Sequence, residues 1–295
     1  MVTVDSSTSH NSLVVGMNGT IGSALLARLQ ADGVSVMGTT QRPDAVLDQH
    51  AMYLNLQDPS SWHVDRRVDV VYLCAGICRM SLCEEDPLGT LKINVDATLA
   101  LARQLAKQGA FVVYLSTNQV FSGQKAYAEA DGEYGPQNEY GRQKAKIESL
   151  LTKHIPSLAI VRLTKVVEPH FPLIQGWIQA LLQNQSVRAF TDMVLAPVSL
   201  RQVVATLVKI GQGKKSGVYQ ISGAEDVSYF DLASYLAQKL GRPRELILAA
   251  NAAEGGMKET FLPRFTTLDC SSIIATFGEN PPHYREVLQE CFALA

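Results

Sequence analysis

Two residues with ionisable side chains stand four positions apart, Tyr140 and Lys144. On a helix, residues at this spacing lie on the same face, so the phenol and the ammonium can converge on one point. A nearby cation favours the phenolate and lowers a phenol pKa that is ordinarily about 10. Tyr140 could then exchange a proton with a carbonyl or alcohol oxygen near neutral pH. By itself the pattern is weak, because YxxxK also occurs by chance on exposed helix faces.

Two further polar residues fit the same chemistry. Thr117 follows the apolar run Phe111–Leu115 by two residues, so it lies at the carboxyl end of a predicted strand, where α/β proteins bind ligands. Its hydroxyl could hydrogen-bond the substrate oxygen that Tyr140 protonates. Asn94, in the helix predicted after the fourth strand, could hold a proton-relay water near Lys144. Together these residues predict proton transfer to or from a substrate oxygen.

A glycine-rich turn, Gly16-Met-Asn-Gly19-Thr-Ile-Gly22, directly follows the first predicted strand. Glycine permits a tight turn and close approach of a pyrophosphate, and the following helix offers free N–H groups to the phosphates. This position predicts a dinucleotide site, and a purely structural turn is the alternative. We expect cofactor contacts from Gly16, Asn18, Gly19, Thr20, Ile21, Gly22, Thr39, Arg42, Cys74, Ala75, Gly76, Asn94, Tyr140 and Lys144.

The end of the second predicted strand bears on the choice of cofactor. Sites for NAD usually place an acidic residue here to hold the ribose 2′-hydroxyl, but the first acid is Asp44. Thr39, Thr40 and Arg42 could instead receive a 2′-phosphate. The sequence favours NADPH, with NADH as the alternative, and Arg42 as an ordinary solvated loop residue is nearly as plausible.

The elements that position these residues alternate in kind. Short apolar runs separated by amphipathic stretches predict an α/β protein with a doubly wound parallel Rossmann sheet. A helix should run from Ile21 to Gly33, and Asp86 should cap another that extends toward Gln108. We expect strands at Leu13–Val15, Val34–Met37, Tyr53–Leu54, Val68–Cys74, Phe111–Leu115 and Leu158–Leu163.

After Leu163 the pattern changes to that of a smaller α+β lobe for the substrate. Ser228 stands three residues before Asp231, as in a capping box, and should begin a helix. We predict a flexible tail over residues 1–12 and a Rossmann domain over 13–165, to which residues near 191–212 return. The substrate-binding lobe is predicted over 166–295.

Composition narrows the class of protein. The 295 residues carry a formal charge of −2, which argues against nucleic-acid binding. No apolar run is long enough to span a membrane, and the polar first residues do not resemble a signal peptide. The five cysteines are odd in number, which fits unpaired thiols in a reducing compartment. We therefore expect a cytoplasmic protein. Cys74, Cys78 and Cys83 lack metal-ligand spacing, and no metal is expected.

These motifs occur together in one known group of proteins. The chain resembles an extended short-chain dehydrogenase/reductase, and within that superfamily it is most similar to dTDP-4-dehydrorhamnose reductases. The resemblance covers nearly the whole chain. The segments that carry it are Val14–Gly22, Cys74–Gly76, Ile93–Val95, Ser116–Phe121, Pro136–Lys144, Val161–Leu163, Gly217–Gly223, Leu262–Arg264 and Leu268–Asp269.

The resemblance implies a catalytic trio of Thr117, Tyr140 and Lys144 and hydride transfer from a nicotinamide to the 4-keto group of a nucleotide-linked deoxysugar. Tyr140 would donate the proton, and Lys144 would hold the nicotinamide ribose. The chain departs from the reductases at Asn118, where they commonly have Asp. Neither Asn118 nor Gln119 supplies the acidic residue that related dehydratases use, so dehydration is disfavoured.

Several expectations about partners stay open. Candidate substrate contacts are Arg79, Asn118, His170, Arg188 and Arg264. The partner is expected to be a nucleotide sugar, with no nucleic acid or membrane, and a homodimer is one candidate assembly. One alternative is an NAD(P)-dependent C4 epimerase of nucleotide sugars. Another is a non-catalytic NADP-binding regulatory subunit, like that of methionine adenosyltransferase.

Overall fold

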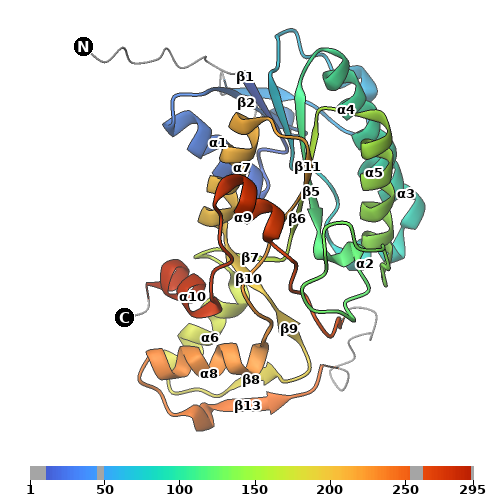
Figure 1. Ribbon diagram of the computed structural model, residues 1–295. Helices are drawn as coiled ribbons and strands as arrows, with labels where there is room; N and C mark the ends of the chain where they lie inside the picture. Colours follow the sequence, from blue (N-terminus) through green and yellow to red (C-terminus); the bar gives the residue numbers. More distant parts are fainter. Residues whose placement is uncertain (1–10, 45–49, 253–261, 294–295) are drawn as a thin grey trace. The chain divides into compact units, whose positions relative to one another are not determined.

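The computed structural model describes residues 11–44, 50–252 and 262–293 (Figure 1). Most of the predicted tail, residues 1–10, lies outside this range. Asn11 and Ser12 belong to the first strand, β1 (Asn11–Val15). The predicted tail over residues 1–12 therefore extends two residues too far. Among the described residues, no helix has both the length and the apolar character that crossing a membrane requires.

Over the described residues, the central sheet has seven strands in the order β11-β6-β5-β4-β1-β2-β3. The pairs β1·β2, β1·β4, β2·β3 and β4·β5 are parallel, as in a doubly wound sheet. The predicted Rossmann fold is therefore confirmed. The other strands of the sheet are β2 (Ser35–Thr40), β3 (Ala51–Tyr53), β4 (Val70–Leu73), β5 (Phe111–Thr117), β6 (Leu158–Leu163) and β11 (Gly217–Ile221).

Helices cover both faces of this sheet (Figure 1). On one side lie α4 (Thr98–Lys107) and α5 (Glu139–His154), and on the other α1 (Thr20–Ala31) and the end of α7 (Leu200–Gly213). Leu25 and Leu29 are the buried apolar residues of α1, which follows from their spacing of four. In α7, a Cβ at Gly211 would overlap the Tyr72 hydroxyl, so glycine lets this helix pack closely on β4.

The helix expected from Asp86 is capped as predicted, because the Asp86 carboxylate accepts the Gly89 N–H at 2.9 Å. It is not one regular helix. A short helix α3 (Pro87–Leu91) leads into a π-helical segment η3 (Lys92–Ala97) and then into α4. A π-helical turn inside a helix changes the direction of its side chains and is frequent at functional sites. Here it contains the buried Asn94.

Contacts divide the chain into two compact units, each made of several stretches of the chain. The predicted domains, with a boundary near residue 165 and a return of residues near 191–212, stay a prediction. The first unit contains the described part of Met1–Leu115 together with Lys146–Ile160 and Leu207–Gly217. The second contains Ser116–Ala145, Val161–Thr206 and the described part of Val218–Ala295. Residues 116–145 group with the second unit because they contact segments that are distant in the sequence. For example, the Gln220 side chain donates hydrogen bonds to the carbonyls of Ala128 and Asp269, each at 2.8 Å.

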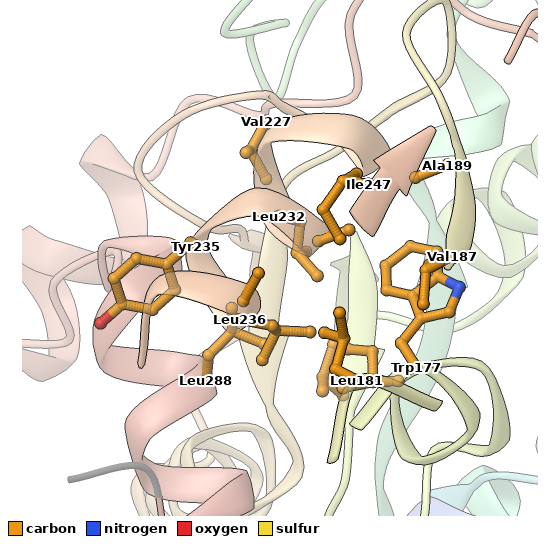
Figure 2. Packing of buried hydrophobic residues seen from close by; sticks show 14 of the residues in the cluster. Trp177, Leu181, Val187, Ala189, Val227, Leu232, Tyr235, Leu236, Ile247 and Leu288 are labelled. Atoms are coloured by element: carbon orange, nitrogen blue, oxygen red, sulfur yellow. The ribbon is translucent and has the colours of Figure 1, made fainter. Parts of the chain in front are cut away.

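The second unit has its own apolar core, which Figure 2 shows from close by. Trp177 and Leu181 of α6 (Pro172–Leu182) pack there with Leu232 and Leu236 of α8 (Tyr229–Lys239). Parallel strands β8 (Val187–Phe190) and β13 (Ile247–Ala250) add Val187, Ala189 and Ile247. Ser228 caps α8 as predicted, accepting the Asp231 N–H at 2.9 Å.

The remaining elements are short. Two further small sheets pair β10 with β7 in parallel and β12 with β9 in antiparallel. The bounds of the other strands are β7 (Lys165–Val167), β9 (Val194–Leu195), β10 (Pro197–Ser199) and β12 (Val227–Ser228). The other helical segments are η2 (Pro59–Ser61), α2 (Met80–Glu85), η4 (Asn118–Val120), η5 (Arg244–Leu246), α9 (Ser271–Phe277) and α10 (Tyr284–Phe292).

Candidate cofactor and catalytic sites

The glycine-rich turn after β1 requires glycine at two of its three positions. Gly16 has a φ of +93°, and a Cβ there would lie 2.9 Å from the Ala75 backbone. A Cβ at Gly22 would overlap the Gly16 carbonyl oxygen. At Gly19 a Cβ would meet only that same oxygen, at 3.6 Å. The first and third glycines therefore close the turn, and the second leaves open space beside the start of α1.

The first backbone N–H groups of α1 follow directly on this turn. Gly19 is the N-cap residue of α1 and has no side chain to accept from the first turn. The turn itself is held by β2, because Thr39 Oγ1 accepts the Gly16 N–H at 3.2 Å and the Thr39 carbonyl accepts the Met17 N–H at 2.9 Å. An anion such as a pyrophosphate suits a glycine turn with uncapped helical N–H groups.

A cavity of about 530 Å³ opens at the carboxyl ends of β1, β2, β3 and β4. Its volume falls within the usual range for small-molecule sites. Among the described residues that line it, none has an acidic side chain. The lining residues are Val15, Gly16, Asn18, Gly19, Thr39, Thr40, Gln41, Leu54, Asn55, Leu56, Gln57, Cys74, Ala75, Gly76, Ile77 and Ile93.

Half of the predicted cofactor contacts line this cavity: Gly16, Asn18, Gly19, Thr39, Cys74, Ala75 and Gly76. Arg42 does not; it is exposed, and its N–H donates to Thr40 Oγ1 at 3.0 Å. The segment Asn55–Gln57, which lies just past β3, also lines the cavity but is not among the predicted contacts. Ligands of α/β proteins bind beyond the carboxyl ends of parallel strands. Because a strand was expected at Tyr53–Leu54, the residues directly after it could have been predicted as part of the site.

Asn94 shapes the loop that follows β4. Its side-chain oxygen accepts the Ile77 N–H at 2.8 Å and its side-chain nitrogen donates to the Ile77 carbonyl at 3.0 Å. Ile77 lines the cavity, so Asn94 fixes part of its wall. The role predicted for Asn94, holding a relay water, stays a prediction.

The proposed catalytic residues lie in the second unit. Tyr140 and Lys144 stand on α5, both nearly fully buried at 9% and 6% exposure, and the Lys144 ammonium nitrogen is 5.8 Å from the Tyr140 ring centroid. Thr117 is the last residue of β5, whose pairing with β4 brings its carboxyl end to the same sheet edge as that of β4. The Thr117 hydroxyl accepts the Gln119 N–H at 3.2 Å and donates to Asn118 Oδ1 at 3.3 Å.

The predicted substrate residues lie on several elements. Arg79, His170, Arg188 and Arg264 are exposed, and Asn118 is half-buried beside Thr117. Arg79 precedes α2, His170 precedes α6, and Arg188 is in β8. The Arg264 guanidinium lies over the Phe265 ring at 5.2 Å. Within the described ranges, no group of three His, Cys, Asp or Glu side chains could hold a metal ion.

The sheet order, the glycine-rich turn and the Tyr140–Lys144 pair define a Rossmann-fold protein of the extended short-chain dehydrogenase/reductase class, a class of NAD(P)-dependent oxidoreductases. A model of the RmlD substrate binding domain family matches residues 10–295, and the chain belongs to this family.

Relatives and a solved structure agree with this assignment. The dTDP-4-dehydrorhamnose reductase of Sinorhizobium fredii is 25% identical over 288 residues, which cover 92% of this chain and 93% of the relative. The methionine adenosyltransferase 2 subunit beta of Bos taurus is 22% identical over 285 residues, 88% of this chain and 80% of the relative. A crystal structure of dTDP-4-dehydrorhamnose reductase from Bacillus anthracis in complex with NADP superimposes with a TM-score of 0.83 at 17% identity, over 96% of this chain and 99% of that one.

Proposed function

We propose that the chain is an NADPH-dependent reductase of a nucleotide-activated 4-keto-6-deoxysugar, similar to dTDP-4-dehydrorhamnose reductases, acting in polysaccharide or glycoside biosynthesis. The observation that carries the proposal is the buried pair on α5. Tyr140 and Lys144 share one helix face with 5.8 Å between the ammonium nitrogen and the ring centroid. Such a pair suits proton donation to a carbonyl oxygen while the carbonyl carbon is reduced.

In this proposal each residue has a separate task. The Tyr140 hydroxyl gives its proton to the substrate oxygen, and the Lys144 cation stabilises the phenolate that remains. Thr117 donates a hydrogen bond from its hydroxyl to the same oxygen, without losing the proton, and so orients the carbonyl. The Thr117 hydroxyl now donates to Asn118 Oδ1 at 3.3 Å; because this bond is long, the hydroxyl would turn and donate to the substrate oxygen instead. When bound, the nicotinamide supplies the hydride.

The residues around the glycine-rich turn fit a dinucleotide. A Cβ at Gly16 or Gly22 would fill the turn that the pyrophosphate must approach, and the cavity extends from this turn to Gln41 and Leu56. Thr39 and Thr40 supply hydroxyls at the end of β2, where an acidic residue would select NADH. These features support NADPH as the preferred cofactor.

The proposal is tested by turnover of defined substrates. Purified protein is supplied with NADPH or NADH and with dTDP- or UDP-4-keto-6-deoxysugars, and the product is identified. We expect consumption of NADPH in equal amount to the alcohol formed. A nucleotide that is retained without consumption, while the sugar is inverted at C4, would favour the epimerase instead.

A regulatory subunit is the second candidate, and the similarity to methionine adenosyltransferase 2 subunit beta favours it. Such a protein would bind NADP and a partner enzyme without reducing a sugar. Absence of turnover on the whole panel, together with copurification of one partner enzyme, would replace the reductase by this function. The chain contains Thr117, Tyr140 and Lys144, the residues that the proposed reduction requires, and this favours the reductase function.

A further inference from the structure

Asn138 joins two segments that carry the proposed catalytic groups. It directly precedes α5, and its Oδ1 accepts the Gly141 N–H at 2.9 Å, which is the hydrogen bond of a helix N-cap. Its Nδ2 donates to Gln119 Oε1 at 2.9 Å. Asn138 is 1% exposed and its bond to Gly141 is buried, whereas Gln119 is half-buried.

Gln119 belongs to the loop that follows Thr117. Its N–H donates to Thr117 Oγ1 at 3.2 Å, within the short helix η4 that Thr117 caps. A Cβ at Gly141 would overlap the Gln119 carbonyl oxygen, so the first turn of α5 packs directly on this backbone. The loop after β5 and the start of α5 are therefore joined through a side chain and through the backbone.

These contacts connect Thr117 to Tyr140 in three steps. Gln119 binds the Thr117 hydroxyl, Asn138 binds the Gln119 side chain, and Tyr140 follows Asn138 by two residues in the turn that Asn138 caps. Asparagine suits this position because one short side chain must both accept from the helix and donate to Gln119. Serine and aspartate can cap a helix but cannot reproduce both bonds.

We propose that Asn138 is a positioning residue, which sets the place of Tyr140 relative to Thr117 by joining the cap of α5 to the loop after β5. This proposal rests on the proposed reductase function. Asn138 does not itself act on the substrate in this role. Its contribution lies in the geometry of the two hydroxyls, and misplacement by about 1 Å can cost about 10²-fold in rate.

Two single variants and their combination test the link. Asn138→Ser keeps a good cap but is too short to reach Gln119, and Gln119→Met keeps the length of the side chain but cannot accept the bond. We expect each variant to lower kcat at least about tenfold, with the dissociation constant of NADPH changed by less than about twofold. The double variant should lose no more than the worse single variant, because both remove the same bond.

Ser228→Ala serves as the matched control. It removes the cap of α8 elsewhere in the second unit, so its melting temperature should fall while kcat stays at the wild-type value. An Asn138→Ser protein that folds and keeps wild-type kcat would overturn the proposal. So would a double variant whose loss equals the product of the two single losses.

Amide hydrogen exchange separates failure of this inference from failure of the reductase function. In Asn138→Ser, residues 118–122 should exchange faster than in wild type, and in Ser228→Ala they should not. Unchanged exchange overturns the inference whether or not sugars are reduced. Faster exchange in a protein whose wild type reduces no sugar would reject the reductase function and still support the link between Asn138 and the loop.

Discussion

The ammonium nitrogen of Lys144 lies 5.8 Å from the centre of the Tyr140 ring, and both side chains are nearly fully buried. Burial matters because a charge acts more strongly on its neighbour where water is excluded. On an exposed helix, water would screen the Lys144 charge, and the charge would stabilise the Tyr140 phenolate only weakly. The influence of Lys144 on Tyr140 thus depends on the burial of the pair as well as on the spacing of the two residues.

Loss of the Tyr140 hydroxyl should stop proton donation. We expect Tyr140→Phe to lower kcat by at least about 10²-fold with the nucleotide-sugar substrate, because general acid catalysis contributes on that order. NADPH oxidation followed by absorbance measures the effect. Tyr53→Phe, at an exposed tyrosine of β3, is the matched control and should keep its activity. Unchanged turnover in Tyr140→Phe would disprove the proposed role of the phenol.

The glycine-rich turn should not tolerate a methyl group at its first position. Gly16→Ala combines a φ of +93° with a contact of 2.9 Å to Ala75, so we expect at least about tenfold weaker NADPH binding by titration calorimetry. Gly176→Ala is the control, because a Cβ at Gly176 of α6 meets nothing within 4 Å. That control should bind normally and gain up to about 1 kcal/mol of stability. Equal binding by both variants would show that the turn does not hold the cofactor.

If Arg42 binds the 2′-phosphate of NADPH, it should contribute to the affinity for NADPH and not to the affinity for NADH. Arg42→Ala should then raise the dissociation constant of NADPH about tenfold or more and leave that of NADH unchanged, since a charge-assisted bond to phosphate is lost. Arg66→Ala, at an exposed arginine on another loop of the same unit, controls for the loss of charge. If the two cofactors weaken equally in Arg42→Ala, the residue does not recognise the 2′-phosphate.

The cysteines should differ sharply in their reaction with a thiol reagent. Burial raises the pKa of Cys270 and of Cys291 to about 11 each, so at pH 8 almost none of their thiolate form is present. Cys78 is exposed and should react first. Absorbance stopped-flow should show one fast thiol that is lost in Cys78→Ser. Fast labelling of Cys270 or Cys291 in the folded protein would contradict their burial.

Local signals in the sequence determined the elements and the type of chemistry. Asp86 and Ser228 cap helices where their side chains predict it, because a cap involves only residues two or three positions apart. The six strands that we expected lie within a few residues of their predicted places, and the glycine-rich turn stands at the first strand-to-helix junction. The pattern Tyr140–Lys144 likewise needed only the spacing of one helix.

Only the tertiary structure decided how distant segments are held together. The bond from Asn138 to Gln119 spans nineteen positions, and the bonds from Gln220 to Ala128 and Asp269 span 92 and 49. No local pattern encodes such pairs, since they form only after the strands have been placed side by side. The π-helical turn at Asn94 and the part of the cavity wall formed by Asn55–Gln57 arise in the same way. The sequence by itself thus determined which groups could act, and packing between remote segments decided which neighbours hold them in place.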